Sequence, residues 1–275
     1  GQLWCWGANT NGQLGDGTTT NQPTPKRVGA ADDWEQAWMQ GSVTCGRRTS
    51  SGVSCWGQDR LGILGRGYLT NYVEQDVPLD DLPTTGLTLG AYSACGLDAG
   101  RAYCSGSPVF GALGSGYDEV VSTPRRVGTD ADWSWIALSW QSLGIRNGEL
   151  YTWGNPVFYS GGNPPELNTY DSPQRYGAIS DWTEVDMGTG HYCGQRTDNS
   201  LTCWGNNSDG QVVGAAIAPF EFTAQGSVIQ NVTGFAAGGG STFYETSGQY
   251  YAVGYNGTGV LGIGTKVAVT TPTAV

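Results

Sequence analysis

Residues 3 to 18 read LWCWGANTNGQLGDGT, and this pattern returns along the whole chain. A short apolar segment ends in Trp6-Gly7, a polar loop follows, and a second glycine, Gly15, comes eight residues after the first. Successive glycines at the end of the apolar segment are 50, 49, 48, 51 and 49 residues apart, at Gly7, Gly57, Gly106, Gly154, Gly205 and Gly254. Six copies at this period indicate one supersecondary unit that is used six times.

Each copy is typical of β-structure. Residues 53–56 and 150–153 are short, rich in aromatic or β-branched residues, and preceded by turn residues such as Asn147-Gly148. No window has the 3.6-residue apolar period of a helix. Short strands, about four per copy, favour propeller blades over a sandwich. We therefore expect an all-β fold: one β-propeller domain over residues 1–275, with four-stranded blades in a ring of six or seven.

Six of the seven cysteines form pairs nine or ten residues apart, with a turn midway. The second cysteine of each pair lies two residues before one of the six repeating glycines given above, here called the blade glycines. This spacing places the partners opposite each other across an antiparallel hairpin, with Cα atoms about 4.5 Å apart, which is within disulfide range. Copies four and six lack both cysteines of the pair, with Leu143 opposite Thr152 and Phe243 opposite Ala252. The predicted disulfides are Cys45–Cys55, Cys95–Cys104 and Cys193–Cys203.

Zinc binding is the rival interpretation of the cysteines, but zinc sites favour closely spaced ligand pairs, and the only histidine is His191. Disulfides instead imply an oxidising compartment, so we expect an extracellular, cell-surface or periplasmic protein. Cys5 occupies the second-cysteine position of copy one, and its mate is expected upstream of Gly1. We therefore expect an incomplete first blade and a chain that is part of a longer one.

Two stretches resemble the signature of the regulator of chromosome condensation repeat: residues 6–15 with Pro25 and Val28, and residues 201–211. Residues 190–193, GHYC, are similar to the glycine–histidine segment of that family. The resemblance covers the whole chain, and the cysteine-bearing version resembles the secreted bacterial members. It implies a β-propeller, most often of seven blades. It does not imply one function, because members include a chromatin-bound nucleotide exchange factor, a plant UV-B photoreceptor and a β-lactamase inhibitor.

The charge distribution argues against nucleic acid as a partner. The net charge is −11, and Lys and Arg occur in adjacent pairs at only three places. A phosphate-binding surface needs clustered Lys and Arg, so we expect no nucleic-acid partner. No stretch approaches 18 consecutive apolar residues, so we expect no membrane span.

No arrangement of residues points to catalysis. His191 is the sole histidine, it lies at a repeat-signature position, and no nucleophile can be assigned to it. Adjacent carboxylates, such as Asp32 with Asp33, give no sign of the facing geometry that acid–base work needs. No metal-ligand or cofactor-binding spacing is present. We therefore predict a protein that is not an enzyme and has no cofactor.

The remaining interpretation is a binding or assembly module. The loops that follow the blade glycines vary most, at residues 58–77, 155–172 and 206–226, and loops on a rigid scaffold usually carry recognition. We predict a partner that is a protein, a glycan or another copy of the chain. The alternatives are an inhibitor of a secreted or periplasmic hydrolase and, less favoured, a guanine nucleotide exchange factor. Aromatic loop residues that could contact a partner are Tyr68, Tyr72, Phe110, Phe158, Tyr159 and Phe220.

Two further sets of residues have predicted roles. The tryptophans that precede the blade glycines are expected to fill the space between neighbouring sheets: Trp6, Trp56, Trp153 and Trp204. Three asparagines match the N-glycosylation sequon and matter only in a eukaryotic secretory pathway: Asn206, Asn231 and Asn256.

Overall fold

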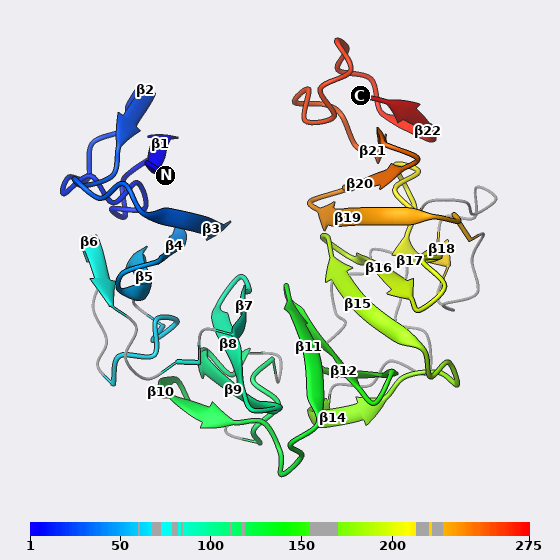
Figure 1. The fold of residues 1–275 in the computed structure, drawn as a ribbon, viewed down its shortest axis with the longest axis horizontal. Helices are drawn as coiled ribbons and strands as arrows, with labels where there is room; N and C mark the ends of the chain where they lie inside the picture. The colour runs from blue at the N-terminus through cyan, green and yellow to red at the C-terminus, as the bar shows by residue number, and fades with distance from the viewer. Residues whose placement is uncertain are drawn as a thin grey trace.

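The computed structural model describes residues 1–59, 61–67, 73–78, 82–83, 85–109, 112–116, 119–154, 170–212, 220–221 and 228–275. These residues form one two-stranded and five four-stranded antiparallel sheets, here called blades A to F in chain order. Figure 1 shows the blades around an open arc, with the first strand of blades B to F turned toward the middle. Within the described part of the chain, no helix is long and apolar enough to cross a membrane.

Each blade is a simple meander, because every strand pairs with the next one along the chain. Blade A contains β1 (Trp4–Gly7) and β2 (Gln22–Arg27). Blade B contains β3 (Trp34–Gln40), β4 (Val43–Arg48), β5 (Gly52–Gly57) and β6 (Val73–Pro78). Blade C contains β7 (Thr85–Leu89), β8 (Ser93–Asp98), β9 (Arg101–Gly106) and β10 (Val121–Arg126). Blade D contains β11 (Trp133–Leu138), β12 (Gln141–Arg146), β13 (Glu149–Gly154) and β14 (Tyr170–Arg175). Blade E contains β15 (Trp182–Met187), β16 (His191–Arg196), β17 (Leu201–Asn206) and β18 (Phe220–Glu221). Blade F contains β19 (Val232–Gly238), β20 (Ser241–Thr246), β21 (Gln249–Gly254) and β22 (Val269–Ala274).

The predicted all-β propeller is confirmed, and the predicted number of blades is wrong. The described residues form five four-stranded blades and one two-stranded blade, not a ring of six or seven. In copy one, β1 and β2 correspond in the repeat register to the third and fourth strands of the other blades. The arc in Figure 1 is open between blade A and blade F.

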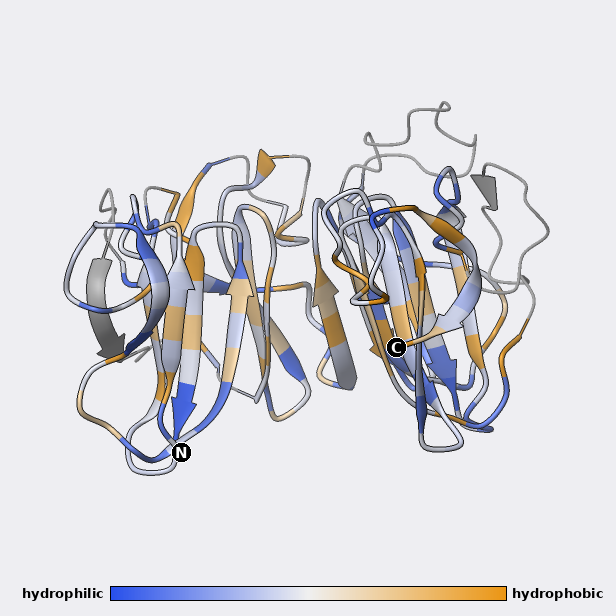
Figure 2. Ribbon diagram, turned by 90° about the horizontal axis from the view of Figure 1, so that it is seen from above, coloured by the Kyte–Doolittle hydropathy of each residue, from blue (hydrophilic) through white to orange (hydrophobic). Residues whose placement is uncertain are grey.

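The core lies between neighbouring blades. Apolar residues are concentrated midway along the strands, as Figure 2 shows, and side chains from two sheets form each cluster. Leu143 and Ile145 of blade D, for example, pack with Trp182 and Val185 of blade E. The second and third strands meet in tight turns such as Asn147-Gly148, where both residues have positive φ (52° and 76°), as a two-residue hairpin requires.

Candidate functional site

A single polar side chain organises the loop that follows most blade glycines. In copy one, Asn9 Oδ1 accepts a hydrogen bond from the Leu14 amide at 2.9 Å, and the amides of Gly12 and Gly15 close two successive turns. The residue two positions after the blade glycine accepts the same bond in three other copies: Asp59 from Leu64 at 2.9 Å, Asn207 from Val212 at 2.9 Å, and Asn256 from Leu261 at 3.1 Å. The loops are therefore held in one shape by internal hydrogen bonds.

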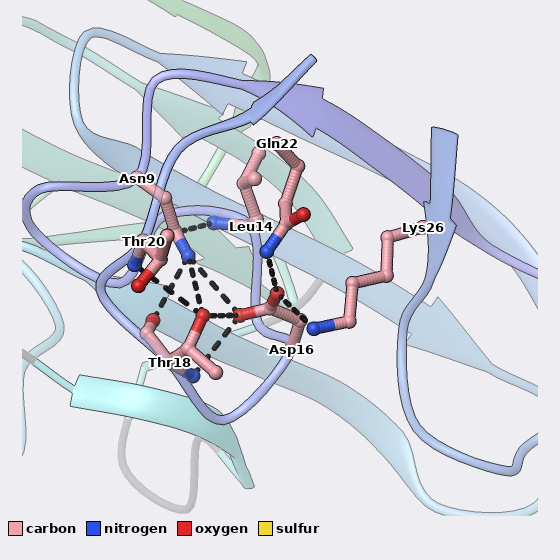
Figure 3. Close-up of polar contacts among 7 residues, drawn as sticks. All are labelled: Asn9, Leu14, Asp16, Thr18, Thr20, Gln22 and Lys26. Carbon is pink, nitrogen blue, oxygen red and sulfur yellow. Dashed lines mark hydrogen bonds and ion pairs between the residues drawn. The ribbon is translucent and has the colours of Figure 1, made fainter. Parts of the chain in front are cut away.

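Asp16 holds together the rest of the first loop (Figure 3). Its Oδ1 accepts hydrogen bonds from Asn9 Nδ2 at 3.1 Å and from the amide and hydroxyl of Thr18 at 3.0 and 2.7 Å. Its Oδ2 accepts one from Gln22 Nε2 at 3.1 Å and pairs with Lys26 Nζ at 2.8 Å. Burial alone raises the pKa of a carboxyl, but the bonds from Lys26 and Thr18 lower the pKa of Asp16 to about 2. This carboxylate therefore stays charged at neutral pH.

The loops of copies one and three are completed by the blade that follows them in the chain. The Trp56 indole N–H of blade B donates to the Gln13 carbonyl in the loop of blade A at 3.0 Å, and the Thr44 hydroxyl donates to the same oxygen at 2.7 Å. Trp153 of blade D donates in the same way to the Ala112 carbonyl of blade C at 3.0 Å. Both indoles are fully buried. We call this contact, between a loop carbonyl and the side chains of the next blade, the loop latch.

The second glycine of the repeat makes room for the latch tryptophan. A Cβ atom on Gly15 would lie 2.5 Å from Trp56 Nε1, and one on Gly114 would lie 2.6 Å from Trp153 Nε1. Both glycines also have positive φ, at 66° and 61°. The eight-residue spacing between the two glycines is therefore a requirement of packing between blades.

The predicted packing of the four tryptophans is confirmed for Trp56, Trp153 and Trp204, which are buried between sheets. It is wrong for Trp6, whose side chain is 59% exposed. Trp6 belongs to the first blade in chain order, so no preceding loop among the described residues is available for its indole to contact.

In the second loop, Asp59 occupies the position that asparagine occupies in the other three loops. Its carboxylate has no N–H group to donate to the surrounding carbonyls. In the last loop, the Asn256 amide nitrogen donates to the carbonyls of Thr265 and Val267 at 2.9 and 3.1 Å. Asp59 is equally buried, its Oδ2 has no hydrogen-bond partner among the described residues, and burial raises its pKa despite the bond from the Leu64 amide. The second loop therefore contains a poorly satisfied carboxyl group.

Asp59→Asn is expected to stabilise the protein by about 1–3 kcal/mol near neutral pH, because an amide removes the buried charge and supplies the missing donor. Urea unfolding of the oxidised chain measures this. Because the pKa of the folded-state carboxyl is raised, its penalty disappears as the pH falls, so the gain should shrink in acid. Asp98→Asn, at an exposed position, makes the same charge change and should leave stability nearly unaltered. A loss of stability in Asp59→Asn would show that the charge itself is needed.

The predicted contact residues of the loops stay a prediction. Five of them lie outside the described residues: Tyr68, Tyr72, Phe110, Phe158 and Tyr159. The backbone of Phe220 lies in β18, and its side chain is also outside the described part.

The structure contains the three predicted cross-strand disulfides. The paired residues lie directly opposite each other, with Cα–Cα distances of 4.1, 4.1 and 4.0 Å, in Cys45–Cys55, Cys95–Cys104 and Cys193–Cys203. All six cysteines are fully buried. The copies without cysteines have the predicted register, since Leu143 faces Thr152 and Phe243 faces Ala252. Cys5 is a buried free thiol whose pKa is raised, first by burial and then by Asp16.

His191 joins blade E to blade F. Its ring is fully buried, and Nε2 lies 2.9 Å from the Thr242 hydroxyl. That hydroxyl donates to the Gln211 carbonyl at 2.8 Å, so the neutral ring donates through Nε2. Burial lowers the pKa of His191 to about 4, despite a backbone hydrogen bond with Ser241 that raises it. These contacts give the histidine a role in packing between blades.

The sequons lie in three different environments. Asn231 is exposed in a turn, and Asn206 is half-buried at the end of β17. Asn256 is fully buried, and its amide nitrogen makes the two loop bonds described above. That nitrogen is inaccessible to a glycan in the folded chain.

The adjacent carboxylates do not form a catalytic pair in the described residues. Asp33 pairs with Arg48 at 2.7 Å and accepts hydrogen bonds from Ser50, which together hold its pKa well below the usual range. Asp32 beside it is exposed. No group of three or more His, Cys, Asp or Glu among the described residues could hold a metal ion.

An axial cavity of about 440 Å³ lies where the first strands of blades B to E converge. A second cavity of about 340 Å³ continues it toward blade F, and the two share residues such as Trp38 and Asp186. The sequence analysis did not identify these residues. The repeat period could have identified them, because four lining residues lie at successive intervals of 49 residues: Trp38, Leu87, Ile136 and Val185.

Comparisons with known proteins agree with this architecture. Two family models, each described as "Regulator of chromosome condensation (RCC1) repeat", match residues 1–53 and 182–211. Protein RCC2 of Homo sapiens is 30% identical over 143 residues, which cover 48% of this chain and 26% of that protein. The chain therefore matches about a quarter of the length of these curated relatives.

Solved structures show the same fold along the whole chain. Human WBSCR16 superposes with a TM-score of 0.81 at 20% identity, covering 99% of this chain and 76% of that one. Prp20p from Saccharomyces cerevisiae gives 0.78 at 20% identity, covering 100% and 74%. The repeat matches in two separate copies, together with the fold shared over the full length, make this chain similar to proteins built from the regulator of chromosome condensation repeat.

Proposed function

We propose that this chain is a non-catalytic protein-binding propeller that acts in an oxidising compartment: outside the cell, at its surface or in a periplasm. The observation that carries the binding proposal is the loop architecture. In four copies the polar loop is held by the same buried Asn or Asp bond, and the loops of copies one and three are latched to the next blade. A rigid scaffold that presents variable loops is a common basis for recognition.

A protein partner is supported by one similar structure. The crystal structure of Prp20p is described together with its binding properties to Gsp1p and histones. Partners of this chain are expected to differ, because the net charge here is −11. Inhibition of a secreted or periplasmic hydrolase is a special case of the same proposal.

The compartment part of the proposal rests on the three buried disulfides, which a reducing cytosol would not maintain in an ordinary mesophile. Protein purified from its native cells under non-reducing conditions, denatured and then alkylated, should therefore keep six cysteines unlabelled. Labelling of all seven cysteines would overturn the assignment to an oxidising compartment.

The binding part is tested on the same material. A partner recovered by crosslinking in the native compartment should bind the purified chain, and Tyr68→Ala with Phe158→Ala should weaken that binding. Gln249→Ala, at an exposed site beside the Ser247-Gly248 turn, is the matched control and should bind normally. Unchanged affinity in the loop variant would contradict recognition through the loops. A panel of secreted hydrolases, assayed with the chain in excess, tests the inhibitor case.

A further inference from the structure

Two carboxylates lie on one wall of the axial cavity. Glu184 and Asp186 alternate along β15, so both project from the same face of the strand, and both line the cavity. The oxygens of Asp186 are fixed by backbone amides, Oδ1 by Met187 and Oδ2 by Ala237 of the next blade, each at 2.8 Å. The Glu184 side chain makes no hydrogen bond or ion pair with any residue in the described part of the chain.

Burial raises the pKa of both carboxyls, and Asp186 raises that of Glu184 further. The wall is therefore a poorly solvated place for negative charge.

A tryptophan stands beside these carboxylates. Trp135 of β11 is half-buried in the cavity wall, and its indole N–H donates at 2.7 Å to the carbonyl of Val185, the residue between the two acids. This bond fixes an aromatic ring from blade D against the acidic strand of blade E. An aromatic face next to carboxylates is an arrangement that attracts organic cations.

On the opposite wall of the cavity, an arginine side chain packs on the face of a tryptophan ring. The Arg47 guanidinium lies over the Trp38 ring, 5.4 Å from its centroid, and both residues line the cavity. The charged residues of the lining are thus two carboxylates and one guanidinium.

We propose that this cavity binds a primary alkylammonium group between Trp135, Glu184 and Asp186. The N–H groups of the ammonium supply the donors that Glu184 lacks. An alkyl stem can lie along the apolar part of the lining, which includes Leu87 and Ile136. The group can belong to a free amine or to a lysine side chain of another protein. The inference does not depend on recognition through the loops.

The test is calorimetric titration of the folded, oxidised chain with butylamine, and saturable binding at one site per chain is expected. Glu184→Gln should weaken binding about tenfold, because it removes the attraction between the carboxylate and the ammonium group. An interaction equivalent to about one pKa unit changes an equilibrium constant about tenfold. Glu245→Gln, on β20 and outside both cavities, changes the net charge equally and should leave affinity unaltered. Equal effects of the two substitutions, or no saturable binding, would overturn the proposal.

Two further titrations separate the contributions and the sources. Tetramethylammonium has no N–H donor and should bind more weakly than butylamine, while Trp135→Leu should weaken both. Stronger binding of tetramethylammonium would contradict the role assigned to Glu184. Cadaverine represents a free amine and Nα-acetyl-lysine methylamide a lysine side chain. The compound that binds more tightly identifies the source of the amine. If Glu184→Gln changes the affinity for neither compound, the result counts against the site.

Discussion

Gly114→Ala should destabilise the propeller by about 3 kcal/mol, because the new methyl group meets a rigid neighbour and the backbone has a left-handed conformation. The Cβ atom would lie 2.6 Å from Trp153 Nε1 and 3.0 Å from Val127 Cγ1, at a residue with φ of 61°. Relief of the clash would move the Trp153 indole N–H away from the Ala112 carbonyl, to which it donates at 3.0 Å. The change in the urea midpoint, with the disulfides intact, measures this loss.

Gly116→Ala provides the matched control in the same loop. Gly116 has a similar φ of 72°, but a Cβ atom there would have no neighbour within 4 Å. Only the backbone term should remain, at about 1 kcal/mol. Equal losses in the two variants would mean that φ alone explains the glycine at position 114, and that the latch tryptophan does not require it.

Acidification from pH ~7 to ~4 is expected to remove about 3 kcal/mol of folding free energy through His191. Burial lowers the pKa of the folded-state ring to about 4, against an ordinary value of 6.5, so the unfolded chain takes up the proton at a higher pH. Protonation therefore favours unfolding throughout this window. Since His191 is the only histidine, the whole histidine contribution comes from one group. Urea unfolding at a series of pH values measures it.

His191→Gln removes this titration and should flatten the pH dependence relative to the parent chain. The difference between the two chains is the relevant quantity, because buried carboxyls with raised pKa values, such as Asp59 and Asp186, act in the opposite direction. Parallel pH profiles in the two chains would show that His191 titrates normally and is not isolated from solvent.

The features that sequence predicted well are local. The cysteine pairs follow from a two-residue strand period and a tight turn, so Cys95 and Cys104 had to face each other once the turn at Ala99-Gly100 was identified. The repeat period likewise predicted the short strands and the propeller. These inferences needed only the spacing of residues along one hairpin or one repeat.

The features that sequence missed depend on neighbours in space. Trp6 has the same local sequence as Trp56, yet it is exposed, because only Trp56 has a preceding loop to contact. The axial cavity needs side chains from four blades, and nothing within one repeat distinguishes Glu184 from a solvated strand residue. The place of Asp59 in the loop hydrogen-bond pattern emerges only when the four loops are compared in space.

The loop latch determines which segment of the chain can be exchanged between propellers as one unit. The loop is completed by a tryptophan and a hydroxyl side chain of the following sheet. A segment that begins and ends at the boundaries of one blade therefore separates such a loop from the side chains that contact it. A segment that starts at one loop and ends after the third strand of the next sheet keeps the loop together with the side chains that contact it. Chimeras of this propeller should therefore be joined just after a third strand, next to glycines such as Gly57 or Gly154, rather than between sheets.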